Sequence, residues 1–418
     1  MSLSESRLSL FASKLVAARW AVAALSISTL FVAPESLAQD PQPGEHDAPA
    51  SVLVDAPAGA ILPALPGPFA VGTQTTEWVD EHRADPFAPS PERRRVIAQL
   101  WYPALSTFHH PRAEYVEEAV GAFYDANLSL REGTLASLPT RAHVNAPPLY
   151  HAGGWPVVLF STGLGVNHHL YTVLLEGLAS EGFVVVALDH PYDAAVIELA
   201  DGTVIQAPAP PTTQEEALAF VEERLQARVA DVAFVLAQLP RLNDRLWHVM
   251  NLKRVGMFGH SLGGATAILS MLQDTRIAAC VNMDGTVFDF SAQAGTSGRP
   301  LMLMSAEGHD MTNDPTWADL WSSMNGPRWE LRLAQSAHLT YSDLAPLVEI
   351  LDLARVLPPE VIAAYVGTVN GPRASSVQLA YLTAFFRETL THRPSPLLRG
   401  PSSRYPEMQW LASSDVER

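Results

Sequence analysis

The stretch Arg254-Val255-Gly256-Met257-Phe258-Gly259-His260-Ser261-Leu262-Gly263-Gly264 decides the fold that we expect for this chain. Its apolar part, Val255 to Phe258, predicts a buried strand, and the small residues that follow through Leu272 predict a helix. The G-x-S-x-G pattern between them is typical of a sharp strand-to-helix turn that exposes a serine hydroxyl at the top of a sheet. An ordinary Gly/Ser turn between a strand and a helix can also match this five-residue pattern by chance. With this strand and helix on either side, we predict that Ser261 is a nucleophile.

Length and composition favour one large α/β domain. The chain has 418 residues, 48% of them hydrophobic, which is enough for a substantial core. Its formal net charge is −17, from 27 basic and 44 acidic side chains. Such a surface repels phosphate backbones, so we expect no nucleic-acid partner. Cys280 is the single cysteine. It cannot form an internal disulfide, and we expect it to be a buried small hydrophobe.

The N-terminus has the pattern of a secretory signal peptide. Basic residues precede an apolar run from Trp20 to Ala33, and Ser36-Leu37-Ala38 forms a small-x-small cleavage site. The run is shorter than the roughly 20 residues of a membrane-spanning helix. We therefore expect residues 1–38 to be a signal peptide cut after Ala38, and the protein to be secreted or periplasmic. Residues 39–67 are rich in Pro and Ala and predict a mobile leader.

Strand-like and helical segments alternate along the rest of the chain, which predicts a mostly parallel sheet with helices on both faces. Segments 69–78 and 94–102 predict an opening antiparallel strand pair. A catalytic domain is expected over 68–393, with an irregular tail over 394–418. Within it, 104–150 is irregular with one amphipathic helix, which forms a wall of the cleft or packs on the core. A long helix is expected to begin after Thr212 or Thr213 and to end at Pro240.

A nucleophilic serine needs a base, and the base needs an acid that orients it. His338 lies just after the last predicted strand of the series, at the sheet edge where ligand sites occur. His309 comes one strand earlier and His392 beyond the final helix, so we choose His338. Asp284 and Asp310 both follow strands after the elbow, and their spacing does not separate them. The expected fold is that of an α/β hydrolase, in which the order along the chain is serine, acid, histidine.

Backbone N–H groups of Leu262 and Leu164 are the predicted oxyanion donors. The first follows the nucleophile, and the second lies in the glycine loop Ser161-Thr162-Gly163-Leu164-Gly165 after an early strand. An ordinary glycine turn is the alternative for this loop. The adjacent pairs His109-His110 and His168-His169 point in different directions and lack further ligands, so no metal site is expected. His260 is expected to pack rather than react.

Several short segments resemble the platelet-activating-factor acetylhydrolases of the plasma type and their bacterial relatives. These segments are Leu159–Gly165 with Tyr171, Leu178–Val185, Gly259–Gly264, Val281–Asp284 and His338–Asp343. The resemblance implies Asp284 as the acid, with Asp310 second, and a serine esterase that needs no cofactor. Thr162 departs from the histidine usual at its position in the family.

The resemblance also implies the substrate. It would be a short or oxidised acyl ester, such as a phospholipid of the platelet-activating-factor type, met in transient contact with a membrane surface and without an obligate protein partner. A general esterase, polyesterase or lipase is one alternative. A binding protein that keeps the fold without turnover is the other.

Overall fold

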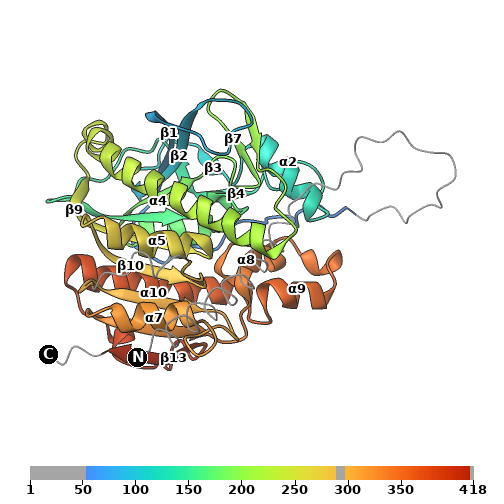
Figure 1. The fold of residues 1–418 in the computed structure, drawn as a ribbon. Coiled ribbons are helices and arrows are strands. Elements are labelled where there is room, and N and C mark those ends of the chain that lie inside the picture. Colours follow the sequence, from blue (N-terminus) through green and yellow to red (C-terminus); the bar gives the residue numbers. More distant parts are fainter. Residues whose placement is uncertain (1–52, 289–296, 415–418) are drawn as a thin grey trace, which may run out of the picture.

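An eleven-stranded sheet forms the centre of the computed structural model, which describes residues 53–288 and 297–414 (Figure 1). The strand order is β13-β12-β11-β10-β9-β5-β6-β2-β1-β4-β3. The signal peptide and the first part of the leader lie outside the described residues, so those two assignments stay predictions.

The opening strands pair as predicted. β1 (Val71–Ala84) and β2 (Arg93–Pro103) are antiparallel, with Trp78 opposite Val96. β2 then pairs antiparallel with β6 (Val184–Asp189), which joins the opening pair to the parallel part of the sheet. At the other edge of the sheet, β1 pairs in parallel with β4 (Pro139–Val144), and β4 pairs antiparallel with β3 (Arg112–Glu114).

Six parallel strands carry the site. In sheet order they are β6, β5 (Trp155–Ser161), β9 (Met250–His260), β10 (Ile277–Met283), β11 (Leu301–Ser305) and β12 (Arg328–Leu333). Their carboxyl ends meet at one edge of the sheet. The loops after β5, β9, β10, β11 and β12 therefore converge, and each carries a residue or loop singled out by the sequence.

Helices cover both faces, because alternate strand residues point to opposite sides. Leu159 and Met257 face a core shared with α4 (Gln214–Arg245), α5 (Leu262–Gln273) and α7 (Pro315–Ser323), and Figure 1 shows α4 crossing in front of the sheet. Phe160 and Phe258 face the other core, with α3 (Thr172–Ser180), α8 (Leu344–Ile350) and α10 (Gly371–Thr391). The predicted fold class is confirmed.

Shorter elements fill the connections. They are α2 (Glu118–Asn127), η3 (His168–Tyr171), β7 (Val196–Glu198), β8 (Val204–Gln206), η4 (His338–Tyr341), η5 (Leu353–Arg355), α9 (Pro359–Val366), η6 (Pro396–Leu398) and β13 (Met408–Ser414). α2 is the amphipathic helix expected within 104–150, and it packs Val120 and Tyr124 into the core.

Four details differ from the sequence predictions. Segment 104–150 is not irregular outside its helix, because it contributes β3 and β4 to the central sheet. Residues 53–67 belong to the domain, since Val54 and Leu62 are buried in its core. α4 continues through Pro240 to Arg245, and the burial of Leu239 and Leu242 on either side offsets the hydrogen bond that proline cannot donate. The tail contains β13, which pairs antiparallel with β12, so it is not irregular throughout.

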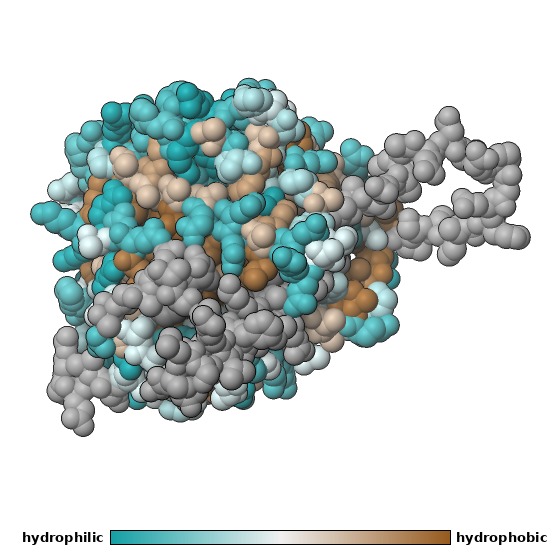
Figure 2. Space-filling view, in the orientation of Figure 1, coloured by the Kyte–Doolittle hydropathy of each residue, from teal (hydrophilic) through white to brown (hydrophobic). Residues whose placement is uncertain are grey.

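The surface that faces the viewer in Figure 2 is mostly hydrophilic, with apolar residues between the polar ones rather than in one continuous band. Within 53–288 and 297–414, each helix is too short or too polar to span a lipid bilayer.

Candidate active site

Ser261 stands on a strained turn between β9 and α5. Its φ of 55° and ψ of −125° lie in a region that non-glycine residues rarely adopt. The turn is closed on both sides by glycine, because a Cβ at Gly259 would lie 2.1 Å from the Gly263 carbonyl oxygen. A Cβ at Gly263 would lie 2.0 Å from the Ser161 carbonyl oxygen. The glycines of the motif are therefore sterically required.

Asp284 and His338 form the predicted acid–base contact. Asp284 follows β10, His338 follows β12, and the imidazole Nδ1–H donates to the carboxylate Oδ2 at 2.6 Å. The Asp284 side chain is 2% exposed and that of His338 is 21% exposed, so the imidazole reaches the surface of the site while its partner stays buried. Asp310, the second candidate, instead accepts hydrogen bonds from Thr312 and Arg332 on a more exposed loop.

His260, inside the elbow motif, connects the serine turn to His338. Its Nε2–H donates to the main-chain carbonyl of His338 at 2.9 Å, and its Nδ1 accepts from the Tyr171 hydroxyl at 2.9 Å. Burial, with the nearby His338, lowers the pKa of His260 well below its usual value, so the ring is neutral. In the described part of the chain the Ser261 hydroxyl and the His338 ring make no direct hydrogen bond, as is common before substrate binds.

The loop after β5 lies against the elbow. Its Gly163 N–H donates to the Tyr171 hydroxyl at 3.0 Å, and a Cβ at Gly163 would lie 3.2 Å from Nδ1 of His260. Neither Leu164 nor the first helical residue, Leu262, has a protein acceptor for its N–H among the described residues. These two N–H groups are the predicted oxyanion donors.

Arg228 on α4 fixes the shape of this loop. Its guanidinium donates to the carbonyl oxygens of Thr162 and Gly163, the second at 3.2 Å, and it is paired with Asp193. Sequence reasoning missed Arg228, because in the sequence it is one polar residue in a long helix, and its loop partners lie about 65 residues earlier. The burial of its side chain marks it as part of the site's support.

A second Ser–His–Asp series lies behind the loop. The Ser161 hydroxyl is 3.1 Å from Nε2 of His190, and Nδ1 of His190 is 2.8 Å from Asp231. All three residues are buried, and Asp231 is also paired with Arg94 and Arg83. Burial lowers the pKa of His190. This series is closed to substrate and holds the end of β5 in place.

His309 is the other residue that sequence reasoning set aside. Its ring is 2% exposed and lies between two carboxylates, with Nδ1 2.8 Å from Asp284 and Nε2 3.0 Å from Asp314. The one signal that could have found it is its position just after β11, at the same sheet edge as Asp284.

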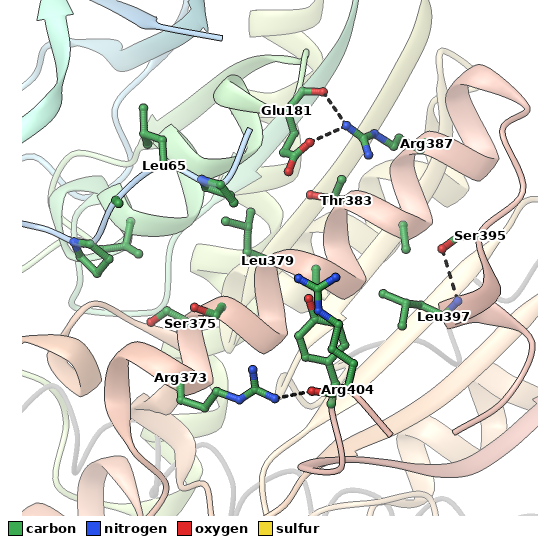
Figure 3. A pocket seen from close by; sticks show the side chains of 18 of the residues that line it. Leu65, Glu181, Arg373, Ser375, Leu379, Thr383, Arg387, Ser395, Leu397 and Arg404 are labelled. Carbon is green, nitrogen blue, oxygen red and sulfur yellow. Dashed lines mark hydrogen bonds and ion pairs between the residues drawn. The ribbon is translucent and has the colours of Figure 1, made fainter. Parts of the chain in front are cut away.

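A cavity of about 750 Å³ lies apart from these residues, beside α3 and α10 (Figure 3). Two of its arginines already have anionic partners, since Arg387 is paired with Glu181 and Arg373 with Glu407. None of Ser261, Asp284 and His338 lines it. In the two described ranges, His, Cys, Asp and Glu side chains form no cluster of three or more that could hold a metal ion.

Comparison with known proteins decides the family. The sequence pattern of platelet-activating factor acetylhydrolase, isoform II, matches residues 58–357. The chain belongs to this family. A probable 1-alkyl-2-acetylglycerophosphocholine esterase of Arthroderma benhamiae is 29% identical over 379 residues, which is 85% of this chain and 95% of the relative. A platelet-activating factor acetylhydrolase of Cavia porcellus is 26% identical over 263 residues, 56% of this chain and 59% of the relative.

A solved structure extends the family assignment. The ferulic acid esterase from Streptomyces cinnamoneus has a TM-score of 0.73 and 31% identity, covering 85% of this chain and all of that one. As a member of the acetylhydrolase family with the α/β hydrolase fold, the chain is an ester hydrolase.

Proposed function

We propose that this acetylhydrolase-family member cleaves esters through an acyl-enzyme formed on Ser261. In this mechanism, His338 takes the proton of the Ser261 hydroxyl as the oxygen attacks the ester carbonyl. The same proton then passes to the leaving alcohol, and a water activated by His338 releases the acyl group. Asp284 keeps Nδ1 of His338 protonated, so that Nε2 is free to act as the base. The 2.6 Å contact between Asp284 and His338 is the observation that carries the proposal.

The N–H groups of Leu164 and Leu262 stabilise the oxyanion of the tetrahedral intermediate in this proposal. Removal of one such donor costs roughly 10²–10³ in turnover. No step requires a metal or cofactor.

The proposal includes export of the protein after cleavage near Ala38. N-terminal sequencing of exported material tests it: a start near Gln39 is expected, and retention of Met1 would contradict export.

The proposed substrates are short or oxidised acyl esters, including phospholipids of the platelet-activating-factor type at a membrane surface. The relatives named for that activity support this choice. An ester of an aromatic acid is the second candidate, favoured by the similarity to a ferulic acid esterase.

One experiment tests the mechanism and another the substrate. The mature protein is incubated with a fluorophosphonate and analysed by mass spectrometry, and we expect one adduct, on Ser261. Absence of an adduct, together with no hydrolysis of p-nitrophenyl acetate, would favour a binding protein. Values of kcat/KM for a chain-length series of p-nitrophenyl esters, an acetylated ether phospholipid and methyl ferulate then separate the substrate classes.

A further inference from the structure

Both oxygens of the Asp284 carboxylate are held in place. Oδ2 accepts from His338 at 2.6 Å, whereas Oδ1 accepts from Nδ1 of His309 at 2.8 Å and from the Ala306 N–H at 2.7 Å. The acid of the proposed triad is therefore shared by two imidazoles, a partly exposed one from the loop after β12 and a buried one from the loop after β11.

The buried imidazole carries a positive charge. Its two nitrogens each face a carboxylate, an acceptor-only group, so both nitrogens must carry a hydrogen. Burial alone would lower the pKa of His309, but the charges of Asp284 and Asp314 and their hydrogen bonds raise it to about 10. The same contacts outweigh burial at Asp284, whose pKa lies well below its usual range.

Several hydrogen bonds fix the position of the Asp314 side chain. It caps the N-terminus of α7 by accepting from the N–H of Thr316, and its carboxylate also accepts from the hydroxyls of Thr316 and Thr286. These bonds favour the ionised carboxylate, because they are all donated to it. His309 therefore lies between two fixed negative groups.

We propose that His309 and Asp314 are positioning residues that hold the Asp284 carboxylate and set the charge that it presents to His338. The inference rests on the proposed function. Asp284 and His309 alone would form a neutral pair, which gives little stabilisation to the imidazolium that forms at His338 during the reaction. Asp314 restores a single net negative charge to the group.

The other titratable or charged side chains around Asp284, His309 and Asp314 are Glu330 and Arg332 on β12, Asp310 on the preceding loop, His260 in the elbow and Tyr341 on η4. They are the same in the variants of His309 and Asp314 below, so differences among those variants report on His309 and Asp314.

Opposite charge changes give opposite expected shifts. In His309→Gln the positive charge is lost, so we expect the acidic limb of the pH profile of kcat/KM to move up by about one pH unit. In Asp314→Asn a negative charge is lost, so the limb should move down by a similar amount. The double variant keeps the net charge of the wild type, and its limb should return to within a few tenths of a unit. Asp310→Asn, a neighbour on the same loop, is the matched control and should leave the limb unchanged.

In parallel, NMR follows the chemical shift of the His338 Cε1 proton as a function of pH in the intact protein. This titration does not need turnover, so it separates failure of this inference from failure of the proposed esterase mechanism. Unmoved midpoints, or midpoints that move in the same direction in both single variants, would overturn the inference. If His309→Gln does not fold, Asp314→Asn decides alone: a downward shift supports the inference and an unchanged midpoint overturns it.

Discussion

Nη2 of Arg228, on α4, lies 3.2 Å from the carbonyl oxygen of Gly163, on the loop that follows β5. In a trans peptide the carbonyl and the N–H of the next residue point in opposite directions. Fixing the Gly163 carbonyl toward α4 therefore turns the Leu164 N–H away from α4. A helix on one face of the sheet thus sets the direction of a proposed oxyanion donor.

Arg228→Lys tests this relationship. Lysine keeps a charge for the buried Asp193, but it cannot reproduce the fork that donates to two carbonyls. We expect kcat to fall by roughly 10- to 100-fold with a smaller change in KM, because the lost donor acts on the transition state. Steady-state kinetics on p-nitrophenyl acetate measures both values.

Arg224→Lys is the matched control for Arg228, since it makes the same substitution one turn earlier on α4, where the guanidinium stacks on Phe87 and Phe220. It should retain most of the activity. A variant of Arg228 that loses thermal stability but keeps its kcat would show that the residue is structural only.

The two candidate acids are separated by Asp284→Asn and Asp310→Asn. The first leaves the shape of the contact with His338 but favours the wrong tautomer, so turnover should fall by about 10⁴. The second removes contacts with Thr312 and Arg332 only, and most of the turnover should remain. Values of kcat for the two variants decide the question, and the reverse order would reassign the acid.

The close approach at the elbow predicts the effect of Gly263→Ala. The new Cβ would meet the Ser161 carbonyl oxygen at 2.0 Å, a main-chain atom at the start of the oxyanion loop. We expect a lower melting temperature and little labelling of Ser261 by fluorophosphonate. Gly298→Ala, where a Cβ has no heavy atom within 4 Å, is the control and should behave like the wild type. Normal labelling of Gly263→Ala would contradict the packing argument.

Asp343 predicts how stability depends on pH. Its buried carboxyl faces Tyr115 and the Val173 N–H, and burial raises its pKa to about 8 from the usual 3.8. Between these values the folded chain holds a proton that the unfolded chain has lost, so stability falls as pH rises and levels off above about 8. In Asp343→Asn this part of the dependence disappears. The melting temperature of Asp343→Asn should fall less steeply between pH 5 and pH 9 than that of the wild type. If the two melting temperatures change with pH in parallel, the assignment is contradicted.

Much of the fold is predictable from the sequence because its signals are local. The apolar run before Gly259 and the small residues after Ser261 define a strand, a turn and a helix within one short stretch. The same holds for the opening strand pair. Pro240 misleads because a local rule is outweighed by burial of the residues around it.

The support of the site is not predictable in this way, because its contacts join distant segments. His309 and Asp310 are neighbours in sequence, yet one side chain points into the core toward Asp284 and the other toward Arg332. Spacing along the chain cannot tell two adjacent residues apart when the decisive difference is side-chain direction. Arg228 is unpredictable for a similar reason, since its loop partners come from another layer of the structure.

The antiparallel pairing of β12 with β13 matters for anyone who produces shortened forms of this protein. The family match ends at residue 357, so a truncation placed there would remove both α10 and β13. The edge of β12 that pairs with β13 would then have unpaired backbone N–H and C=O groups. These could pair with the same strand of another molecule, which leads to aggregation.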